Sequence, residues 1–349
     1  MSLSTLTLRR PDDFHVHLRD TAQMRAVVGA TAQVFGRAIV MPNLKPPITT
    51  TDAAAGYRKR IRDALPADSR FEPLMTLYLT DNTSADDLAR AKASGFVHAV
   101  KYYPAGATTN SESGVTSLPR VNHALAAMER LGIVLSIHGE ITDADVDVFD
   151  RERVFVERHL GSIVRDHPGL RIVLEHITTR EAAQFVADAP PRVAATITPQ
   201  HLLYSRNALF AGGLRPHLYC LPVAKRERHR LALRKAATSG ETCFFIGTDT
   251  APHRRAAKEA ECCSAGVFGG ATALQTYVQV FDEEGALDRF EAFASINGAR
   301  FYGLQLNRGT VVLERRESRV MAAVAVDDAD VVVFQGGQSL PWSVGKVSP

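Results

Sequence analysis

Residues 13–20 read Asp-Phe-His-Val-His-Leu-Arg-Asp, an alternation of apolar and polar side chains that is typical of a β-strand. Successive strand side chains point to opposite faces, so one face is apolar and the other holds His15, His17 and Arg19. Two imidazoles two residues apart lie roughly 6.6 Å apart along a strand, near enough to close on one metal ion. The competing interpretation is that one histidine packs in the core and the other faces water.

The same kind of segment recurs along the chain. Short apolar runs end in a polar or special residue and give way to a helical pattern. The eight runs are Phe14–Leu18, Ala38–Met41, Leu74–Leu79, Val97–Tyr102, Val134–His138, Ile172–His176, Val193–Ile197 and Phe244–Thr248. Their mean spacing of roughly 33 residues is about the size of a βα unit. Eight such units predict an α/β fold of the (β/α)8 TIM-barrel type. The competing open, doubly wound sheet lacks its glycine-rich GxGxxG after the first strand.

Helical patterns lie between these runs, and the last part of the chain is different. The expected helices are Thr51–Leu65, a segment capped by Ser84 and closed by Gly95, Asp147–Asp166 and Lys225–Ser239. Residues 308–349 combine a charged turn with an alternating apolar run, and they are too short for an independent domain. We therefore expect a single domain over residues 1–349, with 308–349 as a C-terminal extension packed on it.

Composition limits the function classes. Of 349 residues, 45% are hydrophobic and 23% are charged, which is the balance of a soluble globular protein. This balance excludes a disordered chain, a collagen-like chain and a small disulfide scaffold. The 41 basic and 38 acidic side chains leave a charge of +3, too weak to indicate nucleic acid or a membrane surface as a partner.

Targeting signals and cysteine usage point to the cytoplasm. No uncharged apolar run approaches the ~18 residues of a membrane helix, and the first residues lack the apolar core of a secretion signal. The four cysteines, at 220, 243, 262 and 263, form no CxxC pair. Reduced thiols in a cytoplasmic protein are the simplest interpretation.

Further potential metal ligands stand at the ends of other predicted strands. His138, His176 and Asp249 end the runs that we expect as the fifth, sixth and eighth strands. Each alone could be an ordinary core or surface residue. In a barrel, however, the carboxyl ends of all strands meet at one mouth, where they join His15 and His17. Neutral imidazole and carboxylate are good ligands for Zn²⁺, so the sequence predicts a metal site there.

Lys101 ends the fourth predicted strand with an inward aspect. A charged lysine in that position is costly unless it is paired. One alternative is therefore an ion pair with a carboxylate, and another is a side chain that reaches the rim. A third is that its neutral amine takes up CO₂ and becomes a carbamate, an anionic ligand with two oxygens that could bridge two metal ions.

Several motifs together resemble the dihydroorotases of the shorter bacterial type, in the amidohydrolase superfamily. The motifs are FHVHLRD (14–20), MPNLKPP (41–47), KYYPAGATTNSESGV (101–115), IHGE (137–140), EHIT (175–178), RPHLYCLP (215–222), GTDTAPH (247–253) and NGARFYGL (297–304). The resemblance spans roughly residues 3–345. The chain departs from the family pattern around Cys262-Cys263-Ser264, which touches no expected ligand.

This resemblance implies a metal-dependent barrel with two zinc ions per chain, bridged by a carbamate on Lys101. It makes Asp249 both a ligand and the general acid/base. It assigns the more buried ion to His15 and His17. It assigns the more exposed ion to His138 and His176. The implied reaction is the reversible cyclisation of N-carbamoyl-L-aspartate to L-dihydroorotate and water in de novo pyrimidine biosynthesis. The resemblance also implies a homodimer.

The substrate carries a carboxylate, and the resemblance implies residues that hold it. They are Arg19, Asn43, His253, Leu221, Ala265, Thr108 and Thr109, the last two on a lid formed by residues 104–116. Arg19 shares the metal-facing side of its strand, so its guanidinium can form a bidentate pair. The alternatives are that Arg19 pairs with Asp20 or Asp13, that Asn43 is only a turn residue, that His253 is a solvated loop histidine and that 104–116 is an ordinary surface loop.

Three rival functions remain at this point. A hydantoinase or allantoinase would use the same metals, although such enzymes usually add a β-sandwich for which this chain has little room. A phosphotriesterase-like hydrolase would not need the carboxylate-binding side chains. An inactive barrel that serves as a structural partner would be marked by loss of a ligand, and all six ligand positions are filled here.

Overall fold

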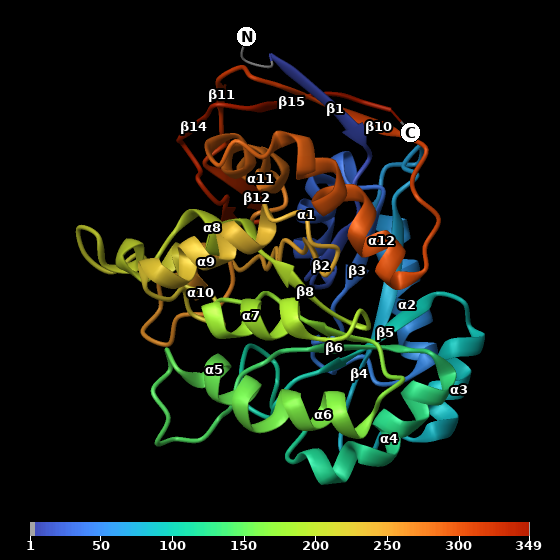
Figure 1. Cartoon of the computed structure of the whole chain (residues 1–349). Helices are drawn as coiled ribbons and strands as arrows, with labels where there is room; N and C mark the ends of the chain where they lie inside the picture. Colours follow the sequence, from blue (N-terminus) through green and yellow to red (C-terminus); the bar gives the residue numbers. More distant parts are fainter. Residues whose placement is uncertain (1–3, 349) are drawn as a thin grey trace.

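Runs rich in β-branched and aromatic residues form the eight parallel strands at the centre of the molecule (Figure 1). The computed structural model describes residues 4–348. The barrel strands are β2 (Asp13–Val16), β3 (Arg37–Val40), β4 (Glu72–Tyr78), β5 (Val97–Tyr102), β6 (Val134–Ile137), β7 (Ile172–Leu174), β8 (Val193–Ile197) and β9 (Phe244–Ile246). Neighbours in the sequence pair with each other in that order. The TIM-barrel prediction is therefore confirmed.

The first and last strands meet just beyond β9. The Asp249 N–H donates to the His15 carbonyl at 2.9 Å, and the His17 N–H donates to the Thr250 carbonyl at 2.9 Å. These two bonds nearly close the barrel. They also bring the two ends of the barrel sequence together at the mouth.

Helices surround the strands (Figure 1). The longer ones are α1 (Thr21–Val34), α2 (Thr51–Ala64), α3 (Ala85–Ala93), α4 (Leu118–Leu131), α7 (Arg180–Asp188), α9 (Glu227–Ala237) and α11 (Ala273–Glu283). Short turns of helix complete the set: α8 (Pro199–Leu203), α10 (Arg255–Lys258), α12 (Asn297–Tyr302), η2 (Arg206–Phe210), η3 (Pro216–Leu218), η4 (Leu287–Arg289) and η5 (Ala292–Ile296). The predicted cap of α3 is confirmed, because the Ser84 side chain accepts from the Asp87 N–H.

The expected helix Asp147–Asp166 is interrupted and begins later. Residues 147–150 form a turn, in which the Asp150 N–H donates to the Asp147 carbonyl at 2.8 Å. The helical part consists of α5 (Arg151–Phe155), the π-helical turn η1 (Val156–Leu160) and α6 (Gly161–Asp166). A π turn accommodates an extra residue within a helix, which a simple helical period does not predict.

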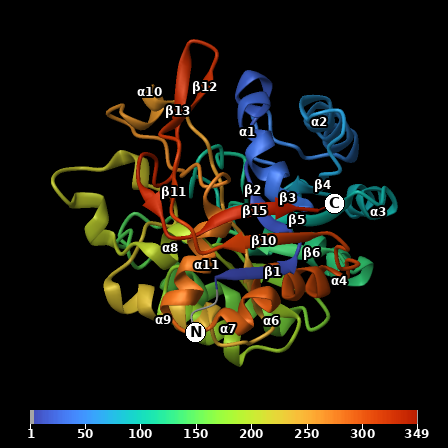
Figure 2. The same cartoon turned by 90° about the horizontal axis from the view of Figure 1, so that it is seen from above.

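The C-terminal extension joins a sheet with the beginning of the chain. β10 (Thr310–Glu314) pairs antiparallel with β1 (Thr5–Arg9) on one side and with β15 (Ser343–Val347) on the other (Figure 2). Two small antiparallel pairs accompany it: β11 (Ser318–Arg319) with β14 (Ser339–Leu340), and β12 (Ala323–Val326) with β13 (Ala329–Val332). The side chains of Val311, Leu313 and Trp342 are buried in the main apolar core.

Three of the barrel strands end before the predicted ligand that follows them, whereas His15 and Lys101 lie within β2 and β5. β6, β7 and β9 end at Ile137, Leu174 and Ile246, whereas the expected runs continued for one to two further residues. His176 has φ 41° and Asp249 has φ 48°, so the backbone leaves the extended conformation there. Residues other than glycine rarely adopt such positive φ values. Those that do so cluster at functional sites.

In the described part of the chain, no helix is long and apolar enough to cross a membrane.

Candidate metal centre and substrate pocket

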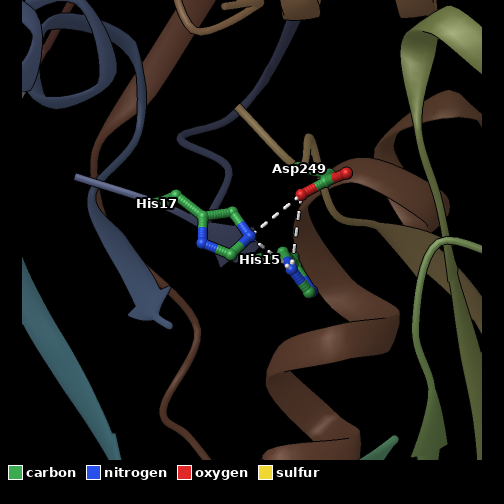
Figure 3. Close-up of side chains that lie close together, drawn as sticks. All are labelled: His15, His17 and Asp249. Atoms are coloured by element: carbon green, nitrogen blue, oxygen red, sulfur yellow. Dashed lines mark hydrogen bonds and ion pairs between the residues drawn. The ribbon is translucent and has the colours of Figure 1, made fainter. Parts of the chain in front are cut away.

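Three ligand atoms converge at the barrel mouth (Figure 3). His15 Nε2 and His17 Nε2 lie 3.3 Å apart. Asp249 Oδ1 lies 3.1 Å from His17 Nε2 and 3.5 Å from His15 Nε2. All three side chains are buried, and their ligand atoms lie within 4.8 Å of one another. The alternative in which one histidine packs and the other faces water is therefore wrong, and the group can hold one metal ion.

His138 and His176 lie next to this group. The His176 ring is centred 4.9 Å from the His15 ring and 4.9 Å from the His138 ring. His176 Nδ1 is buried and has no hydrogen-bond partner among residues 4–348. A buried ring nitrogen left without a partner is available to a metal ion. The predicted second set of donors is therefore at the same mouth as the first.

Lys101 is fully buried, and its Nζ has no hydrogen-bond partner within the described chain. The amine lies 5.1 Å from the centre of the Tyr103 ring. Burial lowers the pKa of Lys101 to about 8, against the opposing effect of Glu175 and Asp249. Because the side chain forms no ion pair with a described carboxylate and does not reach the rim, two of the three alternatives for Lys101 do not fit.

Both imidazoles of the first group are held by oxygen atoms. His15 Nδ1 lies 2.9 Å from Glu175 Oε2. His17 Nδ1 lies 2.8 Å from Asn43 Oδ1. Such a bond places the proton on Nδ1 and leaves the Nε2 lone pair for a metal ion. Asn43 thus lines the pocket and is also the hydrogen-bond partner of His17.

The histidine on the other side is held in the same way. His138 Nε2 lies 2.7 Å from Glu140 Oε2, and both residues are buried. Sequence reasoning assigned no role to Glu140 or Glu175. The available signal was their position, because each stands within two residues of a predicted ligand at the end of a strand.

The protonation states suit a metal site. Burial lowers the pKa of His15 and His176 well below the usual range, and nearby Lys101 adds to this effect. Burial acts to raise the pKa of Asp249, but the His17 hydrogen bond and the neighbouring imidazoles outweigh it and lower the pKa. Metal binding requires neutral imidazole and ionised carboxylate, which is the state these shifts favour.

Arg19 lines the pocket from a position three residues after the end of β2. Its Nη2 lies 2.9 Å from His253 Nε2, and its Nε donates to the Pro252 carbonyl at 3.2 Å. The alternative partners of Arg19 are engaged elsewhere, since Asp20 pairs with Arg60 and Asp13 accepts from Thr248. The Arg19 guanidinium is therefore available to an anionic ligand on the pocket side.

Residues 104–116 lie over the pocket. Thr109 Oγ1 donates to the Ala265 carbonyl at 3.2 Å, and Asn43 Nδ2 donates to the Thr109 carbonyl at 2.9 Å. His253 Nε2 also lies 2.9 Å from that Ala265 oxygen. The lining residues are His17, Arg19, Asn43, Tyr103, Thr108, Thr109, His138, His176, Leu221, Asp249, Ala251, Ala265 and Gly266. Of the residues predicted for the site, only His15, Lys101 and His253 are outside this lining.

Comparisons with known proteins agree with this geometry. Residues 13–312 match the amidohydrolase family. The chain is 58% identical over 337 residues to a dihydroorotase of Cupriavidus pinatubonensis, covering 97% of this chain and 98% of that protein. Two solved structures are 32% identical with a TM-score of 0.91: a dihydroorotase of Campylobacter jejuni, covering 99% of both chains, and one of Saccharomyces cerevisiae in complex with 5-fluoroorotic acid, covering 99% of this chain and 100% of that one.

Three observations agree with one another. They are the barrel, the buried ligand group at its mouth and the similarity to these proteins over nearly the whole length of the chain. The chain belongs to the amidohydrolase family and, within it, to the dihydroorotases.

Proposed function

We propose that this chain is a zinc-dependent dihydroorotase that reversibly cyclises N-carbamoyl-L-aspartate to L-dihydroorotate and water, a step of de novo pyrimidine biosynthesis. The observation that carries the proposal is one pocket lined by metal-ligand side chains, among them His17 and Asp249, and by the Arg19 guanidinium. A cyclic amide that bears a carboxylate needs both features. Its amide must be polarised, and its carboxylate must be bound.

Two zinc ions per chain would be held by the residues that converge at the mouth. His15 and His17 would hold the more buried ion, and His138 and His176 the more exposed one. Asp249 would ligate as well. The fit is supported by the unpartnered, buried Nδ1 of His176 and by the oxygen partners that orient three of the four rings.

Lys101 would supply the bridging ligand after modification. Its Nζ would form a bond to the carbon of CO₂ and lose a proton, which gives an anionic carbamate with two oxygens. The support is that Nζ is fully buried and unpartnered among the described residues, a position that a free amine rarely occupies. The carbamate would also replace a positive charge by a negative one near the imidazoles of His15 and His176.

When bound, the zinc ions supply a water of lowered pKa and polarise the carbonyl that it attacks. Asp249 moves the proton. In hydrolysis it takes the proton of the attacking water and gives it to the ring nitrogen that leaves. In cyclisation it takes the proton of the carbamoyl nitrogen, which attacks the side-chain carboxylate of the same molecule. Asp249 then gives this proton to the carboxylate oxygen whose bond to carbon breaks, and a second proton from solvent completes the water that leaves. The reaction uses no nucleotide, because both reacting groups belong to one bound molecule.

The substrate carboxylate would be bound by Arg19, Asn43 and His253. Leu221 and Ala265 would offer backbone groups. Arg19 and His253 already contact each other in the structure, and Asn43 reaches both His17 and the loop above. That loop, residues 104–116, would act as a lid through Thr108 and Thr109, which exclude water when it is closed.

The first test combines a metal count with an activity assay on one preparation. We expect about two zinc ions per chain. We also expect turnover of dihydroorotate, followed by the loss of its ultraviolet absorbance, and no turnover of hydantoin or allantoin. Two metal ions without dihydroorotate turnover would refute the proposed substrate and retain the metal site. Absence of both after zinc and bicarbonate are supplied would refute the metal site too.

We further propose that the enzyme is cytoplasmic and homodimeric. The four cysteines are free, which agrees with a reducing compartment. Light scattering during size-exclusion chromatography would measure the mass in solution, and a monomeric mass would refute the dimer.

A further inference from the structure

One buried charge beside the pocket has no part in the proposed chemistry. Lys258, on the short helix α10, is 3% exposed. Its Nζ donates to three backbone carbonyls at 2.8 Å each, those of Tyr219, Ser264 and Gly266. An ammonium group has three N–H donors and a neutral amine has two, so the charged form satisfies all three carbonyls.

These three carbonyls belong to two separate segments that wall the pocket. Leu221 lies two residues after Tyr219, and Ala265 lies between Ser264 and Gly266; Leu221, Ala265 and Gly266 all line the pocket. The segments are also joined by the Gly266 N–H, which donates to the Tyr219 carbonyl at 3.0 Å. Lys258 therefore ties both segments at one point.

Of the two segments, residues 264–266 are the one that other side chains of the pocket contact. The Ala265 carbonyl lies 2.9 Å from His253 Nε2 and accepts from Thr109 Oγ1 at 3.2 Å. Gly266 is packed so closely that a Cβ there would lie 2.7 Å from the Ala251 carbonyl oxygen and 2.8 Å from the His253 ring. A small displacement of residues 264–266 would thus move both His253 and the loop contact.

The helix that carries Lys258 is itself anchored. The Arg255 guanidinium forms three hydrogen bonds to Asp330 in β13, at 3.0, 3.2 and 2.8 Å. Figure 2 shows α10 beside the hairpin of β12 and β13. The Lys258 ammonium is therefore held by a helix that is anchored independently of residues 219–221 and 264–266.

We propose that Lys258 is a positioning residue for substrate binding: its ammonium holds residues 219–221 and 264–266 in the arrangement that receives the substrate carboxylate and the closed loop. This inference rests on the proposed function for its substrate, but the contacts that carry it do not involve any metal ligand. Removal of the ammonium weakens substrate binding and leaves metal binding intact.

The test is Lys258→Met, which keeps the length of the side chain and removes its donors. The matched control is Lys92→Met, because Lys92 is exposed and donates to a single carbonyl, that of Gly132, at 3.3 Å. We expect the KM for dihydroorotate to rise about tenfold or more in Lys258→Met, since at least one charged hydrogen bond is lost. We expect kcat to change much less, because the contacts concern binding in both the ground and transition states. The zinc content stays at the wild-type value.

Hydrogen exchange provides a readout that is independent of activity. In Lys258→Met we expect faster amide exchange in peptides that cover residues 219–222 and 264–267, and unchanged exchange in β4 and β5. An unchanged KM, or faster exchange throughout the protein, would overturn the proposal. If the methionine variant does not fold, Lys258→Arg takes its place, since a planar guanidinium cannot serve three carbonyls around one point. A wild-type protein that does not turn over dihydroorotate would refute the proposed function, while the exchange data would still decide the role of Lys258.

Discussion

Replacing Glu175 by glutamine separates charge from shape at the metal site. Glu175 Oε2 accepts from His15 Nδ1 at 2.9 Å and from Thr196 Oγ1 at 2.6 Å, and Oε1 accepts from Ser136 Oγ at 2.5 Å. In Glu175→Gln the carbonyl oxygen can keep the bonds from His15 and Thr196. The amide can turn toward Ser136, whose hydroxyl is able to accept. The number of hydrogen bonds is preserved, and only the charge is lost.

The expected effect follows from that difference. A hydrogen bond to a charged group contributes about 1.5–3 kcal/mol and a neutral one about 0.5–1.5 kcal/mol. The loss is then about 1–1.5 kcal/mol, or roughly tenfold in zinc affinity, and partners of this kind change affinity by about 10–100-fold. We expect Glu175→Gln to bind zinc more weakly than the wild-type protein, because the neutral partner makes the His15 ring a poorer donor to the metal.

The assay is competition for zinc with a chromophoric chelator at neutral pH. The control is Glu72→Gln, the same change at a carboxylate that pairs with Arg58 and Arg62 in the structure. We expect the control to retain the wild-type zinc affinity. Equal affinity in Glu175→Gln and the wild-type protein would show that the charge of Glu175 does not tune His15, and would refute the argument.

Three further outcomes are expected. Lys101→Ala should reduce zinc from about two ions to about one per chain, and added acetate should restore part of the activity; an unchanged metal count would exclude a bridging carbamate. The double variant Thr108→Ala/Thr109→Ala should lower turnover of dihydroorotate, and unchanged turnover would contradict the lid. Burial lowers the pKa of His201 to about 4, so the unfolded chain binds a proton first as the pH falls. The free energy of unfolding should therefore be about 2 kcal/mol lower at pH 5 than at pH 8 because of this residue. The decrease occurs as the pH falls from the usual histidine pKa to about 4. Urea unfolding of wild-type protein and His201→Asn at both pH values measures it, and identical pH dependence would refute it.

The parts of the site that follow from strand alternation could be predicted from the sequence. The positions of His15, His17 and Lys101 depend on a period of two and on the rule that strand ends meet at one mouth. The roles of Glu140 and Glu175 could not be predicted in this way. A carboxylate beside a histidine in the sequence can hold that histidine, hold another or face solvent, and Glu175 in fact holds His15 rather than its neighbour His176.

Long-range pairing was also beyond sequence reasoning. β1 pairs with β10, so that Thr5 lies opposite Glu314, and no local pattern encodes a partner so distant in the sequence. The interruption of the expected Asp147–Asp166 helix has a similar origin, because tertiary packing selects a π turn over a regular period. The positive φ of His176 and Asp249 belongs to the same class, since it is imposed by the barrel around them.

The hydrogen bond between the Asp249 N–H and the His15 carbonyl has a consequence for biosynthesis of the protein. At about 5–20 residues per second, a ribosome adds Asp249 about 10–50 s after His17. Until then β2 has an open edge, a type of edge that promotes association with other chains. In the proposed metal site, His15 and His17 therefore wait for Asp249, and the group of three ligand atoms is complete only in the finished barrel.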